Sequence, residues 1–170
     1  RRVGESVAGY YYLGAQLPIL FFDREPGVTL EGFLEEARKW LRGPDLAALE
    51  ATTGDAPAPS GLPEVLRRYR AFDHELRGDL EAYRRATRAG QDYKPVHVAP
   101  SVVKEGNPLE IEKKLLRLHW DFLSELEVGH AFDIEFVLIY CLKLRVLGRL
   151  FAFDKKKGFE TFHQLCEVTV

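Results

Sequence analysis

The segment between Pro63 and Ala89 carries the pattern that most constrains the fold of this chain. Its apolar residues recur at spacings of three or four, namely Val65, Tyr69, Phe72, Leu76, Leu80, Tyr83 and Ala86. This period places all of them on one face of an α-helix. The segment therefore predicts one long amphipathic helix, whose apolar face needs other elements to cover it.

A second segment, from Asp133 to about Phe151, has almost no polar face. Asp133 is a favourable N-cap, and apolar residues then fill nearly every position, namely Ile134, Phe136, Val137, Leu138, Ile139, Tyr140, Cys141, Leu142, Leu144, Val146, Leu147 and Leu150. A helix that is apolar on all sides is normally buried. We therefore expect this helix to be the centre of the core.

Capping residues mark two more helices. Thr29 precedes an apolar stripe over residues 30–41. Asn107, followed by Pro108 and by an acid at the third helical position, opens a helix that Gly129 closes. These signals predict where both helices begin.

Glycine and proline divide the rest of the chain. Gly43 and Pro44 are expected to end the helix over 30–41, ahead of a short helical piece over 45–51. The loop 54–63 and the connector 90–108 each hold three prolines, so neither can be helical throughout.

The segments at the two ends complete the prediction. Residues 10–18 are rich in β-formers but do not alternate, so strand and helix both remain open there, and a last amphipathic helix starts near residue 157. With 170 residues and 46% apolar content, the chain is long enough for one core. We predict an all-α fold, a single-domain bundle of five to six helices over residues 1–170, with two antiparallel hairpins around the central helix.

Charge and composition argue against several classes of partner. The net charge is −2, so no general affinity for nucleic acid is expected. The longest apolar run, residues 136–142, is far shorter than the roughly 20 residues of a membrane span, so no span is expected. Cys141 and Cys166 have no metal-like spacing and cannot form a disulfide framework, which favours a reducing, cytoplasmic location.

Motifs of catalysis are few. The sequence has no phosphate-binding Gly-Lys-Ser or Gly-Lys-Thr and no Gly-x-Ser-x-Gly elbow, and no cation directly flanks either cysteine. We expect no catalytic residue, no cofactor and no metal. His119 and Asp121 flank Trp120, but residues two apart on a helix do not face each other, so His119 is interpreted as a partly buried structural histidine.

Two Glu-x-x-His motifs offer the alternative of a metal-dependent helical-bundle enzyme. They pair Glu127 with His130 and Glu160 with His163. Two such motifs on facing helices can hold two metal ions in ferritin-like bundles. However, Gly129 lies inside the first motif, so Glu127 and His130 are expected to straddle a turn.

Five arginines form a ridge on the long helix, opposite its apolar stripe. The arginine ridge consists of Arg67, Arg70, Arg77, Arg85 and Arg88. Glu81 is the one acid on that line, although a solvated face normally mixes both signs. The ridge is therefore the candidate contact with an acidic partner, ahead of the run of lysines at 155–157, while ordinary solvated arginines remain the other interpretation.

Two stretches carry a resemblance to a known family. The first is Tyr10-Tyr-Tyr-Leu-Gly-Ala-Gln-Leu-Pro18, and the second runs from Trp120 through Glu127-Val-Gly-His130 and the helix entry into Tyr140-Cys-Leu-Lys-Leu144. Together they cover about a fifth of the chain, and they resemble an uncharacterised bacterial family encoded in V-type ATPase operons. That family is similar in character to the central-stalk subunit of the V-type ATPase, which is called d in eukaryotes.

The resemblance implies a non-catalytic, all-helical component of a rotary V-type ATPase. Its partners would be other ATPase subunits on the rotor or membrane-ring side, and its place would be the cytoplasm, peripheral to the inner membrane through the complex. The central-stalk subunit has three similar lobes, whereas this chain shows no internal repeat. Two alternative roles therefore remain open, a permanent coupling subunit and an assembly factor.

Overall fold

The computed structural model describes residues 3–53 and 61–152, with the backbone alone for residues 3–8. This part of the chain folds into helices without a strand, which confirms the predicted all-α class. The helices are α1 (Val3–Gln16), α2 (Leu30–Trp40), α3 (Gly43–Thr53), α4 (Glu64–Arg88), α5 (Pro100–Lys104), α6 (Pro108–Glu127) and α7 (Ile134–Ala152). Among them, none combines the length and apolar character needed to cross a membrane.

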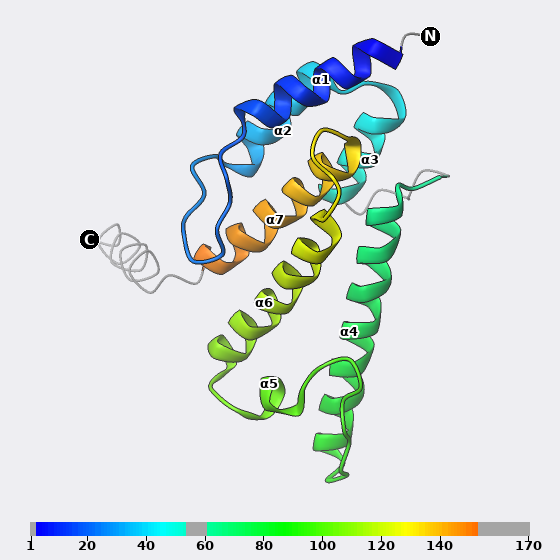
Figure 1. Cartoon of the computed structure of the whole chain (residues 1–170). Helices are drawn as coiled ribbons and strands as arrows, with labels where there is room; N and C mark the ends of the chain where they lie inside the picture. The colour runs from blue at the N-terminus through cyan, green and yellow to red at the C-terminus, as the bar shows by residue number, and fades with distance from the viewer. Residues whose placement is uncertain (1–2, 54–60, 153–170) are drawn as a thin grey trace, which may run out of the picture.

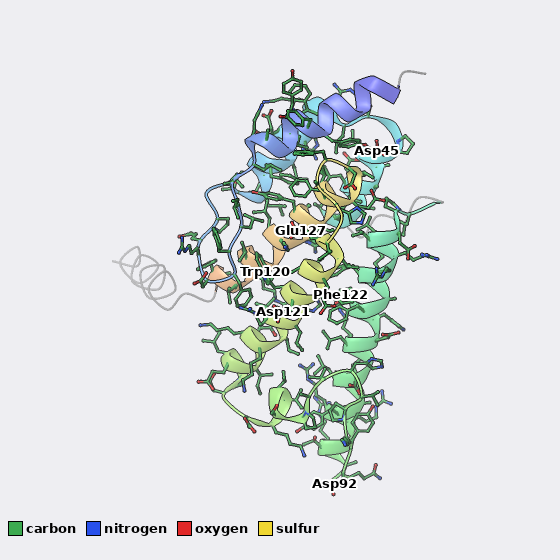
Figure 2. The ribbon with its side chains drawn as sticks, viewed as in Figure 1. Asp45, Asp92, Trp120, Asp121, Phe122 and Glu127 are labelled. Carbon is green, nitrogen blue, oxygen red and sulfur yellow. The ribbon has the colours of Figure 1, made fainter. Side chains whose placement is uncertain are left out.

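The helices form an elongated arrangement (Figure 1). α4, α6 and α7 run lengthwise, α1 to α3 lie at one end, and α5 with the connector lies at the other. α6 and α7 form an antiparallel hairpin and share the most extensive contact between any two of these helices. Between α4 and α6, the rings of Phe72 and Phe122 stack with their centroids 4.2 Å apart. Figure 2 labels Phe122 on α6.

α7 is the central helix, as its lack of a polar face predicts. It contacts α1, α2, α3, α4 and α6. Its buried positions form an almost unbroken run, namely Val137, Leu138, Ile139, Tyr140, Cys141, Leu142, Lys143, Leu144, Val146 and Leu147. The Cys141 thiol is buried within this run beside the hydroxyl of Thr52, and burial raises its pKa to about 11, as expected of a core residue. Cys166 lies outside the described residues.

The segment over residues 10–18, which the sequence left open between strand and helix, is helical as far as Gln16. Tyr10 and Leu13 are buried, and this spacing of three residues fits the helical period. The Tyr10 hydroxyl also donates to the carboxylate of Asp45, which joins α1 to α3 (Figure 2). Packing against neighbouring helices thus decides a conformation that local propensity does not.

The predicted helix starts are confirmed by their cap hydrogen bonds. Thr29 Oγ1 accepts from the amide of Gly32 at 3.1 Å, and Asn107 forms a reciprocal capping box with Glu110. Asp133 Oδ1 accepts from the amide of Phe136 at 2.8 Å. Each cap satisfies an amide that the first turn of a helix leaves without a backbone partner.

One predicted helix boundary is wrong. Gly43 and Pro44 do not end the helix over 30–41, because α2 already ends at Trp40 and these two residues begin α3. Proline is well tolerated in the first turn of a helix, where its missing amide hydrogen has no intrahelical partner in any case. A Gly-Pro pair can therefore mark either the end of one helix or the beginning of the next.

The connector 90–108 is held to α4 by the carboxylate of Asp79. Asp79 is buried, and it accepts a hydrogen bond from the Tyr93 hydroxyl at 2.8 Å and one from the His97 amide at 2.7 Å. The short helix α5 follows and had no expected counterpart. Val98, buried against Leu76 and Leu115, gives this end its own small apolar cluster.

Candidate functional site

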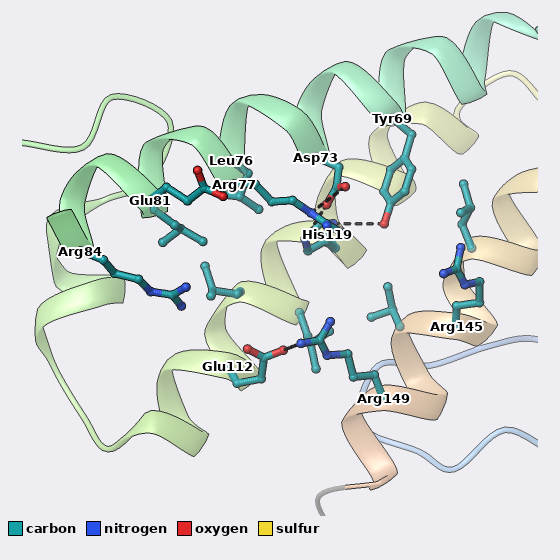
Figure 3. A pocket seen from close by; sticks show the side chains of 15 residues that line it. Tyr69, Asp73, Leu76, Arg77, Glu81, Arg84, Glu112, His119, Arg145 and Arg149 are labelled. Carbon is teal, nitrogen blue, oxygen red and sulfur yellow. Dashed lines mark hydrogen bonds and ion pairs between the residues drawn. The ribbon is translucent and has the colours of Figure 1, made fainter. Parts of the chain in front are cut away.

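A groove of about 610 Å³ lies between α4 on one side and α6 and α7 on the other (Figure 3). Its walls carry charged side chains of both signs, namely Asp73, Arg77, Glu81, Arg84, Glu112, Arg145 and Arg149. Buried leucines of α4 and α6, including Leu76 and Leu115, lie beneath them. The groove therefore offers a charged rim over an apolar floor, with arginine the commonest charged residue.

Some of these charges are already paired within the groove. Arg77 Nε lies 2.9 Å from an oxygen of Asp73, and Arg149 Nη2 lies 2.6 Å from an oxygen of Glu112. In residues 3–53 and 61–152, Arg84 and Glu81 have no ion-pair partner, although both line the same wall. Figure 3 shows the Arg84 guanidinium reaching over the groove from α4, where it is available to a carboxylate or phosphate group.

Three residues of the groove, Tyr69, His119 and Asp73, lie close together. The Tyr69 hydroxyl lies 3.1 Å from Nδ1 of His119, whose Nε2 is 3.9 Å from Asp73. Burial raises the pKa of Tyr69 to about 12, and burial also lowers the pKa of His119 despite the nearby Asp73. The phenol therefore stays protonated and the imidazole largely neutral at neutral pH, so this cluster joins α4 to α6 without an activated oxygen nucleophile.

These contacts confirm that His119 is partly buried, as predicted. The side chain of His119 is 15% exposed, and it faces α4. Asp121 instead points to Arg117, with 2.9 Å between Oδ1 and Nε. The two residues that flank Trp120 thus face different partners, as their spacing on a helix requires.

The arginine ridge is divided among different environments. Arg67 pairs with Glu64, and Arg77 turns into the groove toward Asp73. Arg85 and Arg88 are exposed and, within the part of the chain that the structure describes, form no hydrogen bond or ion pair through their side chains. The end of α4 that carries Arg85 and Arg88 is therefore the most available portion of the ridge.

Arg70 has a structural contact instead. Its Nη2 donates to the carbonyl oxygen of Ala51 at 3.0 Å, and Arg145 of α7 donates to the next carbonyl, that of Thr52. These are among the last carbonyls of α3, which lack intrahelical donors and carry partial negative charge. The two arginines thus close the C-terminal end of α3.

The sequence did not identify Arg84, Arg145 and Arg149 as site residues. Arg145 and Arg149 are four apart on α7, so they share a face of a largely apolar helix. That spacing is a signal that could have pointed to a charged groove beside the core. Arg84 lies one residue from the predicted ridge, and only the position of α6 and α7 shows that it faces inward.

The first Glu-x-x-His motif does straddle a turn, as its glycine predicts. α6 ends at Glu127, Gly129 has a φ of +92°, and His130 follows outside the helix. The carboxylate of Glu127 is paired with the ammonium group of Lys143. Glu160 and His163, like the lysines at 155–157, lie outside the described residues.

His130 has nearer partners than the motif suggests. Its Nδ1 lies 2.7 Å from Asp133 Oδ2, and the carboxylate of Glu135 is close enough that the three groups could surround one cation. Asp133 is also the cap of α7 through its other oxygen. Capping accounts for Asp133 and positions His130 beside it, so these contacts are explained without a ligand.

Taken together, the described residues define an all-helical protein with an arginine-rich groove and a cationic helix end. The chain belongs to the family described as protein of unknown function (DUF2764), whose model matches residues 62–169. The match includes the stretch over 120–144 and leaves out the one over 10–18. No curated protein and no solved structure matches the chain.

Proposed function

We propose that the chain is a non-catalytic helical subunit, or an assembly or coupling factor, of a bacterial V-type ATPase, similar to the central-stalk subunit of that enzyme. It acts by contacts with other ATPase subunits, in the cytoplasm and peripheral to the membrane through that complex. The proposal rests on the resemblance carried by residues 10–18 and 120–144. The observation that supports a binding role is the cationic surface formed by the end of α4 and the groove beside it.

Charge and geometry explain how this surface would work. Arg85 and Arg88 are exposed and lack intramolecular partners in the described part of the chain, so binding need not break an existing ion pair. A guanidinium group presents two parallel donors that match the two oxygens of a carboxylate. An acidic surface on another ATPase component is therefore the contact that fits, and ionic strength should weaken the association.

Affinity purification from the native organism tests the proposal. The full chain, tagged at its own locus, should recover V-type ATPase subunits that mass spectrometry identifies above an untagged control. The double variant Arg85→Glu/Arg88→Glu should recover less of them at low salt, and the difference from wild type should shrink as salt rises.

A matched control has the same change in charge at other exposed cations. The variant Arg68→Glu/Lys113→Glu adds the same negative charge, one site on α4 outside the ridge and one on α6. It should recover ATPase subunits like wild type. If no ATPase subunit is enriched with the wild-type chain, the assignment is wrong, whereas equal losses in both double variants would reject the end of α4 as the contact.

A further inference from the structure

Four aromatic side chains form a continuous row on the outer surface of α1. We call Trp40, Tyr12, Tyr11 and Phe132 the aromatic row. Tyr12 stacks on Trp40 with ring centroids 5.6 Å apart, Tyr11 meets Tyr12 edge to face at 6.2 Å, and Tyr11 lies 5.0 Å from Phe132. The row therefore joins α1 to the end of α2 and to the turn before α7.

The row is exposed to an extent unusual for large aromatic residues. Tyr11 and Tyr12 are 55% and 54% exposed, Phe132 is 47% and Trp40 is 39%. A large aromatic side chain buries roughly 150–250 Å² when enclosed, so four that are about half exposed present on the order of 400 Å². A contiguous apolar patch of this size on a protein surface typically marks an interaction site.

No charged side chain lies beside Tyr11 and Tyr12 on α1. Residues 9–17 contain no charged side chain, so both faces of this part of the helix are uncharged. Tyr10 and Leu13 cover the inner face, while the outer face has no covering element among the described residues. The rings of Tyr11 and Tyr12 are therefore left exposed on the side of α1 that no other described element covers.

The row is also held in place before any partner binds. Trp40 Nε1 donates to Glu36 at 3.2 Å, which fixes the indole ring. A Cβ added to Gly14 would lie 3.2 Å from Phe132, so this ring packs directly against the α1 backbone. Rings fixed in this way lose little side-chain entropy on binding, and Tyr and Trp are common anchors of interfaces.

We propose that the aromatic row is the centre of a symmetric dimer between two copies of this chain. A stable interface buries about 800 Å² on each partner, with an apolar centre inside a polar rim, and the row supplies an apolar centre of about half that area. Because the row is uncharged, two copies can meet there without like-charge repulsion. Two copies that met at the cationic end of α4 would instead repel each other.

The edge of the row at Trp40 is complementary to itself. Glu36 and Lys39 lie beside Trp40 and pair with each other at 2.5 Å, so each copy presents one acid and one base at the same edge. In a twofold arrangement, the same patch of both copies meets, and an edge that holds both signs can pair with its own image. This self-complementarity favours a second copy over a partner of uniform charge.

Sedimentation equilibrium over a wide range of concentrations tests the proposal. The full chain should reach twice its 19.4 kDa mass as concentration rises. Tyr12→Glu should weaken the dimer at least about tenfold, because it places a charge at the centre of the row, whereas Tyr12→Phe keeps the ring and should dimerise like wild type. Val96→Glu, at an apolar residue that is 79% exposed in the distant connector, controls for the added charge.

Each outcome of these measurements either supports or overturns the proposed dimer. A wild-type chain that stays monomeric at every concentration overturns the proposal, as does a dimer that Tyr12→Glu leaves intact. Circular dichroism should show that Tyr12→Glu keeps its helices, and Tyr11→Lys, at the other half-exposed tyrosine, provides the same test if it does not. The ATPase pull-down uses other residues, so the two proposals can fail independently.

Discussion

The ammonium group of Lys143 pairs with the carboxylate of Glu127 across the interface of α7 and α6. Lys143 is 6% exposed, and its Nζ lies 4.9 Å from the centre of the Trp120 ring (Figure 2 shows Trp120 and Glu127 on α6). A charge in the core of a protein is costly unless it is paired. Glu127 thus serves as the counter-ion of the most buried cation on α7.

Removing this counter-ion should destabilise the protein. In Glu127→Gln, the ammonium group of Lys143 stays buried beside a neutral amide, and we expect a loss of about 1–3 kcal/mol in the free energy of unfolding. Urea denaturation followed by circular dichroism measures the change.

Lys143→Met provides the control for that prediction. It removes the buried charge and keeps an unbranched side chain, so its cost should be smaller than that of Glu127→Gln. The double variant should be no less stable than Glu127→Gln alone, because the orphaned charge is gone. Additive losses in the double variant would show that the two groups do not depend on each other.

The central helix gives a second prediction. Leu138 is fully buried on α7, so Leu138→Ala leaves a cavity and should cost about 2–5 kcal/mol. Val128→Ala is the comparison, since Val128 is 81% exposed and should change stability by less than about 0.5 kcal/mol. Equal, small effects in chemical denaturation would remove α7 from the centre of the core.

The helices could be predicted from the sequence because their signals are local. The stripe from Val65 to Ala86 and the cap at Asn107 need only residues three or four apart, and both predictions are confirmed. The centre of the fold was predictable for a similar reason, since α7 has almost no polar side. Tyr10 and Leu13, by contrast, become a helical contact only through the helices that pack against them.

The candidate site was less predictable because it depends on tertiary position. Arg70 and Arg77 share a line on an isolated helix. In the fold, however, Arg70 donates to a carbonyl at the end of α3, and Arg77 pairs with Asp73 in the groove. The periodicity of α4 gives no sign that Asp79 is buried, because its hydrogen-bond partners Tyr93 and His97 lie in the connector, outside the helix. Periodicity places a residue on a face, and it does not say what that face meets.

The buried carboxylate of Asp79 gives a prediction about pH. Burial alone would raise its pKa, but hydrogen bonds from the Tyr93 hydroxyl and from the amides of His97 and Val96 bring the pKa below its usual 3.8. The folded pKa is then lower than the unfolded one, so the contribution to stability is complete above about 3.8 and is lost as pH falls through the folded value.

A carbon-13 NMR titration of the Asp79 carboxyl group measures this pKa directly. It should titrate below 3.8 in wild type and move upward in Tyr93→Phe, which loses one hydrogen bond to the charged form. Tyr83→Phe serves as the control on the same end of α4. If Tyr93→Phe leaves the titration unchanged, the hydroxyl does not stabilise the carboxylate.

The two functions assigned to the arginine ridge can be separated by comparing Arg70 with Arg88, which have the same chemistry on the same helix. Arg70→Ala removes the donor to the Ala51 carbonyl at the end of α3 and should cost about 1–2 kcal/mol in the free energy of unfolding. Arg88→Ala removes an exposed side chain without a partner in the described part of the chain, so it should change stability by less than about 0.5 kcal/mol. Binding to an acidic partner should show the opposite order, with the larger loss in Arg88→Ala, because Arg88 alone of the two presents a guanidinium group that no carbonyl already occupies. Urea denaturation and the recovery of partners at low salt measure both orders, and equal stability losses would show that the contact between Arg70 and α3 does not support the fold.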